Sequence, residues 1–210
     1  GWLIAAGCAI GAAFQVKMLE AWILVPAVFV PYLVAAAPRW RTRVWQVLVA
    51  GVAALAASLW WVVLVSLVPA SQRPWVGGSN SDSAWEMVFG YNGLGRFGIA
   101  SERSFVADFA GSAGLPRLIG PQLAVDVGWF LPLAVAALVV GLIVTARRPR
   151  VDVERAGYLL FGLWLIPSVL VLAFAEGIHT FYVLLYALPA VVLAAAGARR
   201  AIVWCRAGRR

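Results

Sequence analysis

The chain has 210 residues, of which 63% are hydrophobic and 12% are charged, and its mean hydropathy is +0.90. Because soluble domains carry roughly 25% charged residues, this composition excludes a soluble globular protein and indicates a polytopic membrane protein. The formal net charge of +8 does not indicate nucleic-acid binding, since most arginines lie in short clusters beside hydrophobic segments.

Hydrophobic segments of membrane-spanning character follow one another along the chain. We expect an all-α, polytopic membrane helical bundle with six spans: Trp2–Phe14, Met18–Ala36, Val44–Val68, Val125–Ala146, Ala156–Ala175 and His179–Ala198. The first segment is short and has neither an initiator methionine nor a basic region before it, which predicts that the chain is a fragment of a longer protein. We expect residues 1–210 to form one transmembrane domain.

Three arginine clusters predict the topology. They lie at residues 39–43, 147–155 and 199–210, and a pair of predicted spans separates each cluster from the next. Because positively charged loops remain on the cytoplasmic side, we expect all three clusters there, in a multi-pass protein of the plasma membrane in contact with its lipids. The long loop 70–122 would then be extracytoplasmic.

The loop 70–122 is rich in aromatic residues, which favours an ordered, functional segment over a disordered one. Ser83 and Glu86 have the spacing of a capping box and predict the start of a short amphipathic helix, which Gly90 would end. Three residues would form the apolar face of this helix: Trp85, Val88 and Phe89. This pattern predicts a helix lying in the membrane interface.

The glycine-rich stretch GYNGLGRFG follows this helix, and its glycines allow the backbone to approach a ligand closely. We expect Tyr91, Asn92 and Arg96 to contact that ligand. The alternative is that the loop forms a structural cap over the helical bundle.

Two residue types occur only once in the chain. Lys17, the single lysine, lies at the outer end of two predicted spans, where it would either anchor the helix at the interface or bind a lipid phosphate. His179, the single histidine, has Tyr182 one turn later, and we interpret it as a residue lining a polar pocket or, second, as a proton carrier. Because no cluster of metal-ligand residues surrounds it, we expect neither a metal nor a cofactor.

Four stretches in chain order resemble the dolichyl-phosphate-mannose-protein mannosyltransferase-like group, glycosyltransferase family 39, and its actinobacterial members in particular. They are FQVKMLEAW, SQRPWVGGSNSDSAWEMVFGYNGLGRFG, GLPRLIGPQLAVDVGWFLPLA and EGIHTFYVLLYALPAVVLAAAG. The group also includes the aminoarabinose transferases of lipid A. The resemblance implies a GT-C fold, and transfer of a sugar from a polyprenyl-phosphate donor to a lipid, protein or glycan acceptor at the extracytoplasmic face.

The resemblance also implies roles for single residues. Lys17 matches the lysine near the lipid phosphate, residues 90–96 match the mobile loop that closes over the site, and His179 and Tyr182 match a His-x-x-Tyr motif. The catalytic acidic residue of the family lies upstream of this fragment, so the catalytic residue is unknown and the fragment alone would be inactive. Glu20 stands where a neutral residue is expected and would be able to pair with Lys17.

Two other functions are consistent with the sequence. One is a carrier or flippase for a lipid-linked sugar, although the spans lack the charged residues that ion-coupled transporters carry near the membrane centre. The other is a non-catalytic membrane subunit that holds a partner enzyme.

Overall fold

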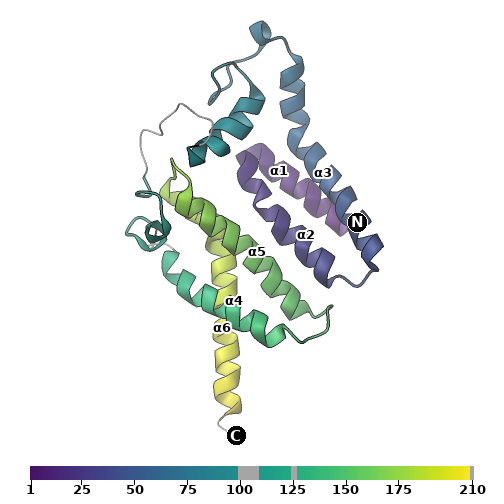
Figure 1. Ribbon diagram of the computed structural model, residues 1–210, viewed down its shortest axis with the longest axis vertical. Coiled ribbons are helices and arrows are strands. Elements are labelled where there is room, and N and C mark those ends of the chain that lie inside the picture. Colours follow the sequence, from purple (N-terminus) through teal and green to yellow (C-terminus); the bar gives the residue numbers. More distant parts are fainter. Residues whose placement is uncertain (99–108, 124–126, 209–210) are drawn as a thin grey trace. The chain divides into compact units, whose positions relative to one another are not determined.

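The computed structural model describes residues 1–98, 109–123 and 127–208. Within these ranges it contains helices and no β-strand, which confirms the all-α prediction. The α-helices are α1 (Trp2–Trp22), α2 (Leu24–Ala35), α3 (Trp40–Leu67), α4 (Leu131–Thr145), α5 (Val153–Phe174) and α6 (Leu184–Ala207) (Figure 1).

Five helical segments of the described chain are long and apolar enough to cross a membrane, which confirms the polytopic membrane class. They are Trp2–Trp22, Trp40–Leu67, Gly128–Thr145, Val153–Phe174 and Thr180–Ala207. The second expected span, Met18–Ala36, is instead divided between the end of α1 and the short α2. Pro26 explains the division, because a proline lacks the N–H that would bond to the carbonyl of Trp22 and its ring clashes with that carbonyl.

The predicted boundary between the first two spans does exist, but as a kink inside α1. Lys17 (φ −143°, ψ 37°) and Met18 (φ 35°, ψ −125°) both leave the helical conformation. A positive φ is unusual for a residue other than glycine, so the contacts around Met18 must hold it in place. The kink therefore places the only lysine of the chain at a break in the helix.

The chain divides into two compact units. The first consists of the described residues of Gly1–Val25, Pro38–Ala107 and Ala175–Gly177, and thus holds α1 and α3. The second consists of the described residues of Pro26–Ala37, Asp108–Phe174 and Ile178–Arg210, and holds most of α2 together with α4, α5 and α6. The expectation of a single transmembrane domain stays a prediction.

In the first unit, α1 packs closely along α3 (Figure 1). A Cβ atom on Gly7 would collide with the carbonyl oxygen of Ala50, and one on Gly11 would collide with Ala57. This close approach of two backbones is the contact that a GxxxG pattern predicts. The side chain of Gln15 fixes the register, since its Nε2 donates a hydrogen bond of 2.9 Å to the carbonyl oxygen of Ala57.

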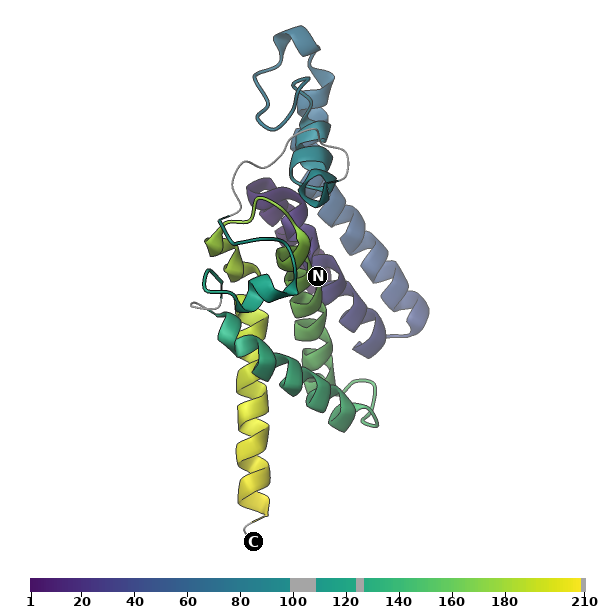
Figure 2. The same cartoon turned by 60° about the vertical axis from the view of Figure 1, so that its left-hand side comes forward.

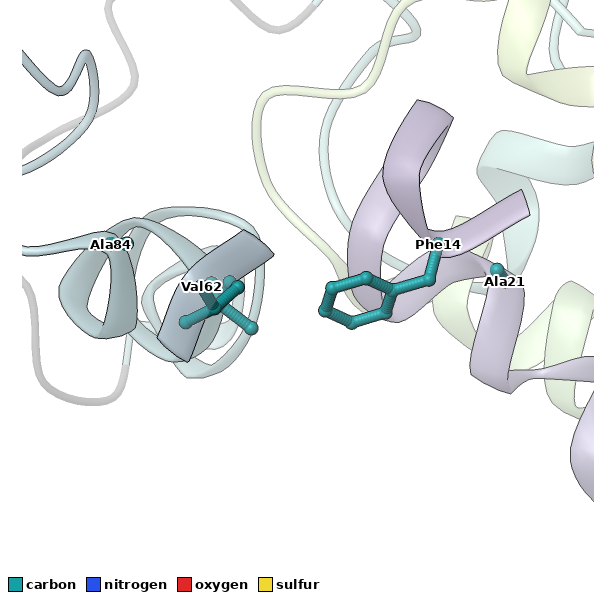
Figure 3. Packing of buried hydrophobic residues seen from close by; sticks show 5 residues of the cluster. Phe14, Ala21, Val62 and Ala84 are labelled. Atoms are coloured by element: carbon teal, nitrogen blue, oxygen red, sulfur yellow. The ribbon is translucent and has the colours of Figure 1, made fainter. Parts of the chain in front are cut away.

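The core of the first unit joins both helices to the loop that follows α3. The ring of Phe14 in α1 points toward Val62 in α3, and both side chains are buried (Figure 3). Ala84 and Val88 of the loop belong to the same cluster. This packing holds the loop against the kinked end of α1.

In the second unit, α4, α5 and α6 pack on one another (Figure 2). Small residues lie at these contacts. Gly141 of α4 lies against the ring of Tyr158 in α5, and Gly162 of α5 lies against Leu138. Glycines at such contacts let membrane helices approach closely and gain van der Waals contacts, which drive association where no water is displaced.

Charged residues join one end of the second unit. Glu154 of α5 pairs with Arg148 at 2.6 Å and also with Arg200 of α6. The backbone N–H of Arg155 donates to Asp152 at 2.8 Å, and this bond holds the pKa of the Asp152 carboxyl below its usual value. The second arginine cluster and the described part of the third thus meet through Glu154. The side of the membrane on which the clusters lie stays a prediction. Arg209 and Arg210 lie outside the described residues.

Candidate functional site

Lys17 and Glu20 form an ion pair at the kink of α1. The Nζ atom of Lys17 lies 3.6 Å from Oε1 of Glu20. The side chain of Lys17 remains 41% exposed and that of Glu20 22% exposed. The pairing anticipated from the sequence is therefore present, and the side chain of Lys17 stays partly exposed.

A short helix, Glu86–Tyr91, lies in the loop where the sequence predicts one, but it is a π-helix. Ser83 acts as predicted at its start, since the Ser83 Oγ accepts a hydrogen bond of 3.3 Å from the N–H of Glu86. Gly90 does not end the helix, which continues to Tyr91. The wider π-helical turn carries the backbone past the glycine, because its hydrogen bonds span five residues rather than four.

The carboxylate of Glu86 does not complete the predicted capping box. It accepts hydrogen bonds of 2.9 Å from the backbone N–H of Asn80 and from the hydroxyl of Ser81. These two bonds hold the pKa of Glu86 below its usual value. Glu86 therefore closes the polar turn 79–86 instead of pairing with Ser83.

The predicted apolar face of this helix is divided. Val88 is fully buried in the core of the first unit. Trp85 and Phe89 are 38% and 40% exposed and stack on each other, with ring centroids 5.9 Å apart and planes inclined by 8°. The exposed pair fits the predicted membrane-interface position, which stays a prediction.

Asn92 connects the glycine-rich stretch to the kink of α1. Its Nδ2 donates to the sulfur of Met18 at 3.2 Å and to the carbonyl oxygen of Met87 at 3.1 Å. The neighbouring Gly93 packs so closely on Leu19 that a Cβ atom there would lie 2.7 Å from its Cδ1. These contacts explain how Met18 is held at a positive φ.

Arg96 is buried and joins the loop to residues 175–177. Its Nη1 donates to the carbonyl oxygens of Gly177 at 3.1 Å and Glu176 at 3.3 Å, and the N–H of Glu176 donates back to the Arg96 carbonyl at 2.6 Å. The guanidinium lies 5.6 Å from the ring centre of Tyr91, within cation–π range, and interacts electrostatically with Glu20. Arg96 thus fixes the loop, Tyr91 and the α5–α6 turn together.

Tyr91 itself is about one-third exposed, and Gly78 packs against its ring. A Cβ atom on Gly78 would lie 2.7 Å from Cγ of Tyr91, and Gly78 also has a φ of +85°, so a glycine is needed there on both counts. Tyr91, Asn92 and Arg96 are therefore brought together with Lys17 in the first unit.

His179 and Tyr182 belong to the second unit. The imidazole of His179 stacks on Phe109 at 4.7 Å and on Phe181 at 5.2 Å between ring centroids, and it meets the edge of Tyr182 at 5.7 Å. The two predicted residues are thus in contact, within an aromatic cluster of four rings.

The structure adds three groups that the sequence did not single out. Phe109 and Phe181 hold the imidazole of His179, and the carbonyl groups of residues 176–177 hold Arg96. Phe181 was accessible to prediction through its position beside His179 in the sequence. The carbonyl acceptors were not, because every residue carries one.

Within residues 1–98, 109–123 and 127–208, no group of three or more His, Cys, Asp or Glu residues is placed to hold a metal ion.

Two curated proteins of Bacillus subtilis (strain 168) are similar to this chain. The protein named "Putative mannosyltransferase YkcB" is 43% identical over 96 residues, which are 45% of this chain and 13% of that protein. The protein named "Putative mannosyltransferase YycA" is 37% identical over 95 residues, which are 45% of this chain and 14% of that protein. The chain thus matches well under a fifth of the length of these relatives.

The chain is similar to proteins named as mannosyltransferases. This confirms the resemblance to mannosyltransferase-like glycosyltransferases that the sequence motifs predicted. No family model matches the chain, and no solved structure does. Its place in glycosyltransferase family 39 and among actinobacterial members stays a prediction.

Proposed function

We propose that the chain is part of a membrane glycosyltransferase that moves a sugar from a polyprenyl-phosphate donor to a lipid, protein or glycan acceptor at the extracytoplasmic face. The observation that carries this proposal is the 43% identity over 96 residues to a protein named as a mannosyltransferase. The membrane-length helices support a lipid-linked donor, because such a donor keeps its phosphate at the membrane surface.

Lys17 is the residue that we propose to bind the donor phosphate. It lies at the kink inside the membrane-length helix α1, and its side chain is 41% exposed. An ammonium group beside the phosphate would offset the negative charge that develops as the sugar–phosphate bond breaks. Glu20 pairs with this ammonium group, so phosphate binding would displace or weaken the ion pair.

The residues around Lys17 supply the support for such a site. Asn92 holds the kink through Met18, and Arg96 holds the loop through the carbonyl groups of residues 176–177. A site closed by this loop would exclude water, which otherwise competes with the acceptor for the sugar. In the second unit, His179 and Tyr182 are separate candidates for contact with substrate. A carboxylate outside this chain would remove the acceptor's proton.

The test is transfer of radiolabelled mannose from polyprenyl-phosphate mannose by the complete protein in lipid vesicles. We expect Lys17→Ala to lower the transfer rate about 100-fold, the usual effect of removing one group that stabilises transition-state charge. Glu20→Gln removes the negative charge beside the Lys17 ammonium group, so we expect this variant to retain transfer and to lower the KM for the donor.

Arg41→Ala is the control, since it removes a cation from the predicted cytoplasmic cluster and should transfer at the wild-type rate. Wild-type transfer by Lys17→Ala would remove Lys17 from the site. Movement of the intact sugar lipid to the other leaflet without cleavage would identify a flippase instead.

A further inference from the structure

A polar cavity of about 310 Å³ lies in the second unit, apart from the predicted site residues. Its wall includes Gly111, Ser112, Ala113, Arg117, Gly120 and Gln122. Ligand pockets have volumes of roughly 300–1,000 Å³, so this cavity suits a ligand of one small ring. We name it the 111–122 cavity.

Arg117 forms a fixed, positively charged part of this wall. The residue is only 4% exposed, and its guanidinium donates to the carbonyl oxygens of Ser112 at 3.1 Å and Leu172 at 3.0 Å. These bonds hold the guanidinium in one orientation, because its planar fork fits both acceptors at once. A rigid donor group of this kind can bind ligand oxygens without being ordered by the ligand.

The backbone around the cavity is held open by glycines and tied to α5. Gly111 has a φ of +88°, and Gly114, with a φ of +143°, donates its N–H to the carbonyl oxygen of Ala173 at 2.6 Å. A side chain is strained at such φ values, so the loop needs glycine at both positions. The wall therefore combines a bare backbone with the hydroxyl of Ser112 and the amide of Gln122.

One edge of the cavity adjoins the aromatic cluster. The N–H of Ala110, which lines the cavity, donates to the carbonyl oxygen of Ile178 at 3.1 Å, and this bond joins the loop to the residues that precede α6. The preceding Phe109 stacks on His179, and Phe109 and Phe181 remain 57% and 59% exposed. Exposed aromatic rings thus lie next to polar groups in a single unit.

We propose that the 111–122 cavity binds the pyranose ring of a sugar. A pyranose has hydroxyls that bond to guanidinium, amide and hydroxyl groups, and an apolar C–H face that stacks on aromatic rings. The cavity wall offers the polar partners, and the exposed ring of Phe109 belongs to the residue that precedes Ala110 of this wall. An acyl chain would gain nothing from the Arg117 guanidinium, and a free phosphate would gain nothing from the Phe109 ring. The proposal rests on the proposed function for the choice of mannose, and the sugar is that of either the donor or the acceptor.

The experiment measures binding of methyl α-D-mannopyranoside to the complete protein in lipid nanodiscs by saturation-transfer NMR. We expect the wild type to bind it, Gln122→Ala to weaken binding about fivefold through the loss of one hydrogen bond, and Ala113→Phe to abolish binding by filling the cavity. Ile119→Ala, a change on an exposed side chain of the same loop that does not line the cavity, should bind as the wild type does.

Absence of binding by the wild type, or unchanged binding by Gln122→Ala and Ala113→Phe, would overturn the proposal. If Ala113→Phe does not fold because the phenylalanine is too large, Gln122→Ala still tests the proposal. Sugar binding without any transfer activity would refute the proposed function and leave the cavity assignment standing. If the wild type transfers sugar and the cavity variants still bind it normally, the proposed function would stand and the cavity assignment would be refuted.

The source of the sugar follows from hydrolysis of polyprenyl-phosphate mannose without an acceptor. If the cavity holds the donor sugar, Gln122→Ala slows this hydrolysis together with transfer. If the cavity holds the acceptor sugar, the variant slows transfer alone. Either result agrees with a pyranose in the cavity.

Discussion

The predicted site residues in the first and second units are held in place by different forces. In the first unit, Asn92 and Arg96 are fixed by directional hydrogen bonds to a sulfur and to backbone carbonyls. In the second, His179 is fixed by stacking between Phe109 and Phe181. A directional bond is lost with a single side chain, whereas a stacked ring can be replaced by another ring of similar shape. The first region should therefore be the more sensitive to substitution.

Of the substitutions that test this difference between the two units, Arg96→Ala should have the largest effect. It leaves the carbonyl groups of Glu176 and Gly177 without the guanidinium, and a hydrogen bond to a charged group contributes about 1.5–3 kcal/mol. We expect faster amide hydrogen exchange at residues 94–97 and 175–177, and a transfer rate lowered at least about tenfold.

Arg73→Ala is the control, because its guanidinium also donates to two carbonyls, those of Ser66 and Val68, but not to residues 175–177. Equal protection of 175–177 in the wild type and Arg96→Ala would show that the loop is held by other contacts.

A pair of substitutions at His179 should give an intermediate effect. His179→Phe preserves the stack and should keep the melting temperature in detergent, whereas His179→Ala loses ring contacts that contribute roughly 0.5–1.5 kcal/mol each. If the imidazole nitrogens contact substrate, both variants should transfer sugar more slowly, and only His179→Ala should melt earlier. Wild-type transfer by His179→Phe would mean that the ring has a structural role only.

The smallest effect concerns the turn closed by Glu86. Its pKa is lowered mainly by the N–H of Asn80 and then by the hydroxyl of Ser81, so the ionised carboxylate stabilises the folded turn. This contribution is complete above the pKa of an unfolded glutamate and is lost as the pH falls through the lowered pKa of the folded state. We expect protection of the Asn80 amide, corrected for intrinsic exchange, to fall over this acidic range. Glu86→Gln should lack that pH dependence, and a variant that retained it would assign the titration to another group.

The sequence was sufficient to predict the features that depend on composition and short-range pattern. Runs of apolar residues predicted the helices, and Ser83 predicted the start of the short helix. The division of the predicted second span was missed, although Pro26 carries the signal for it. The pairing of Lys17 with Glu20 was anticipated because Glu20 stands where the resemblance implies a neutral residue, and the structure contains this ion pair.

The sequence could not predict contacts between a side chain and backbone atoms that lie far away along the chain. Arg96 was expected to contact a ligand through its charge, but its guanidinium donates to the carbonyls of residues 176–177, which no side-chain pattern identifies. The stacking of His179 on Phe109 was likewise unreadable, because 70 positions separate the two in the numbering of the chain. Part of the loop 70–122, residues 99–108, lies outside the described residues.

The bonds of Arg96 also constrain the order in which the protein is assembled. Glu176 and Gly177 follow Arg96 by 80 and 81 positions, so the ribosome must add α4 and α5 before either acceptor exists. At about 5–20 residues per second, this delay is roughly 4–16 seconds. During that time α1, α3 and the loop can pack on one another, but the guanidinium lacks its final partners. The first unit is thus completed only after most of the second has been synthesised.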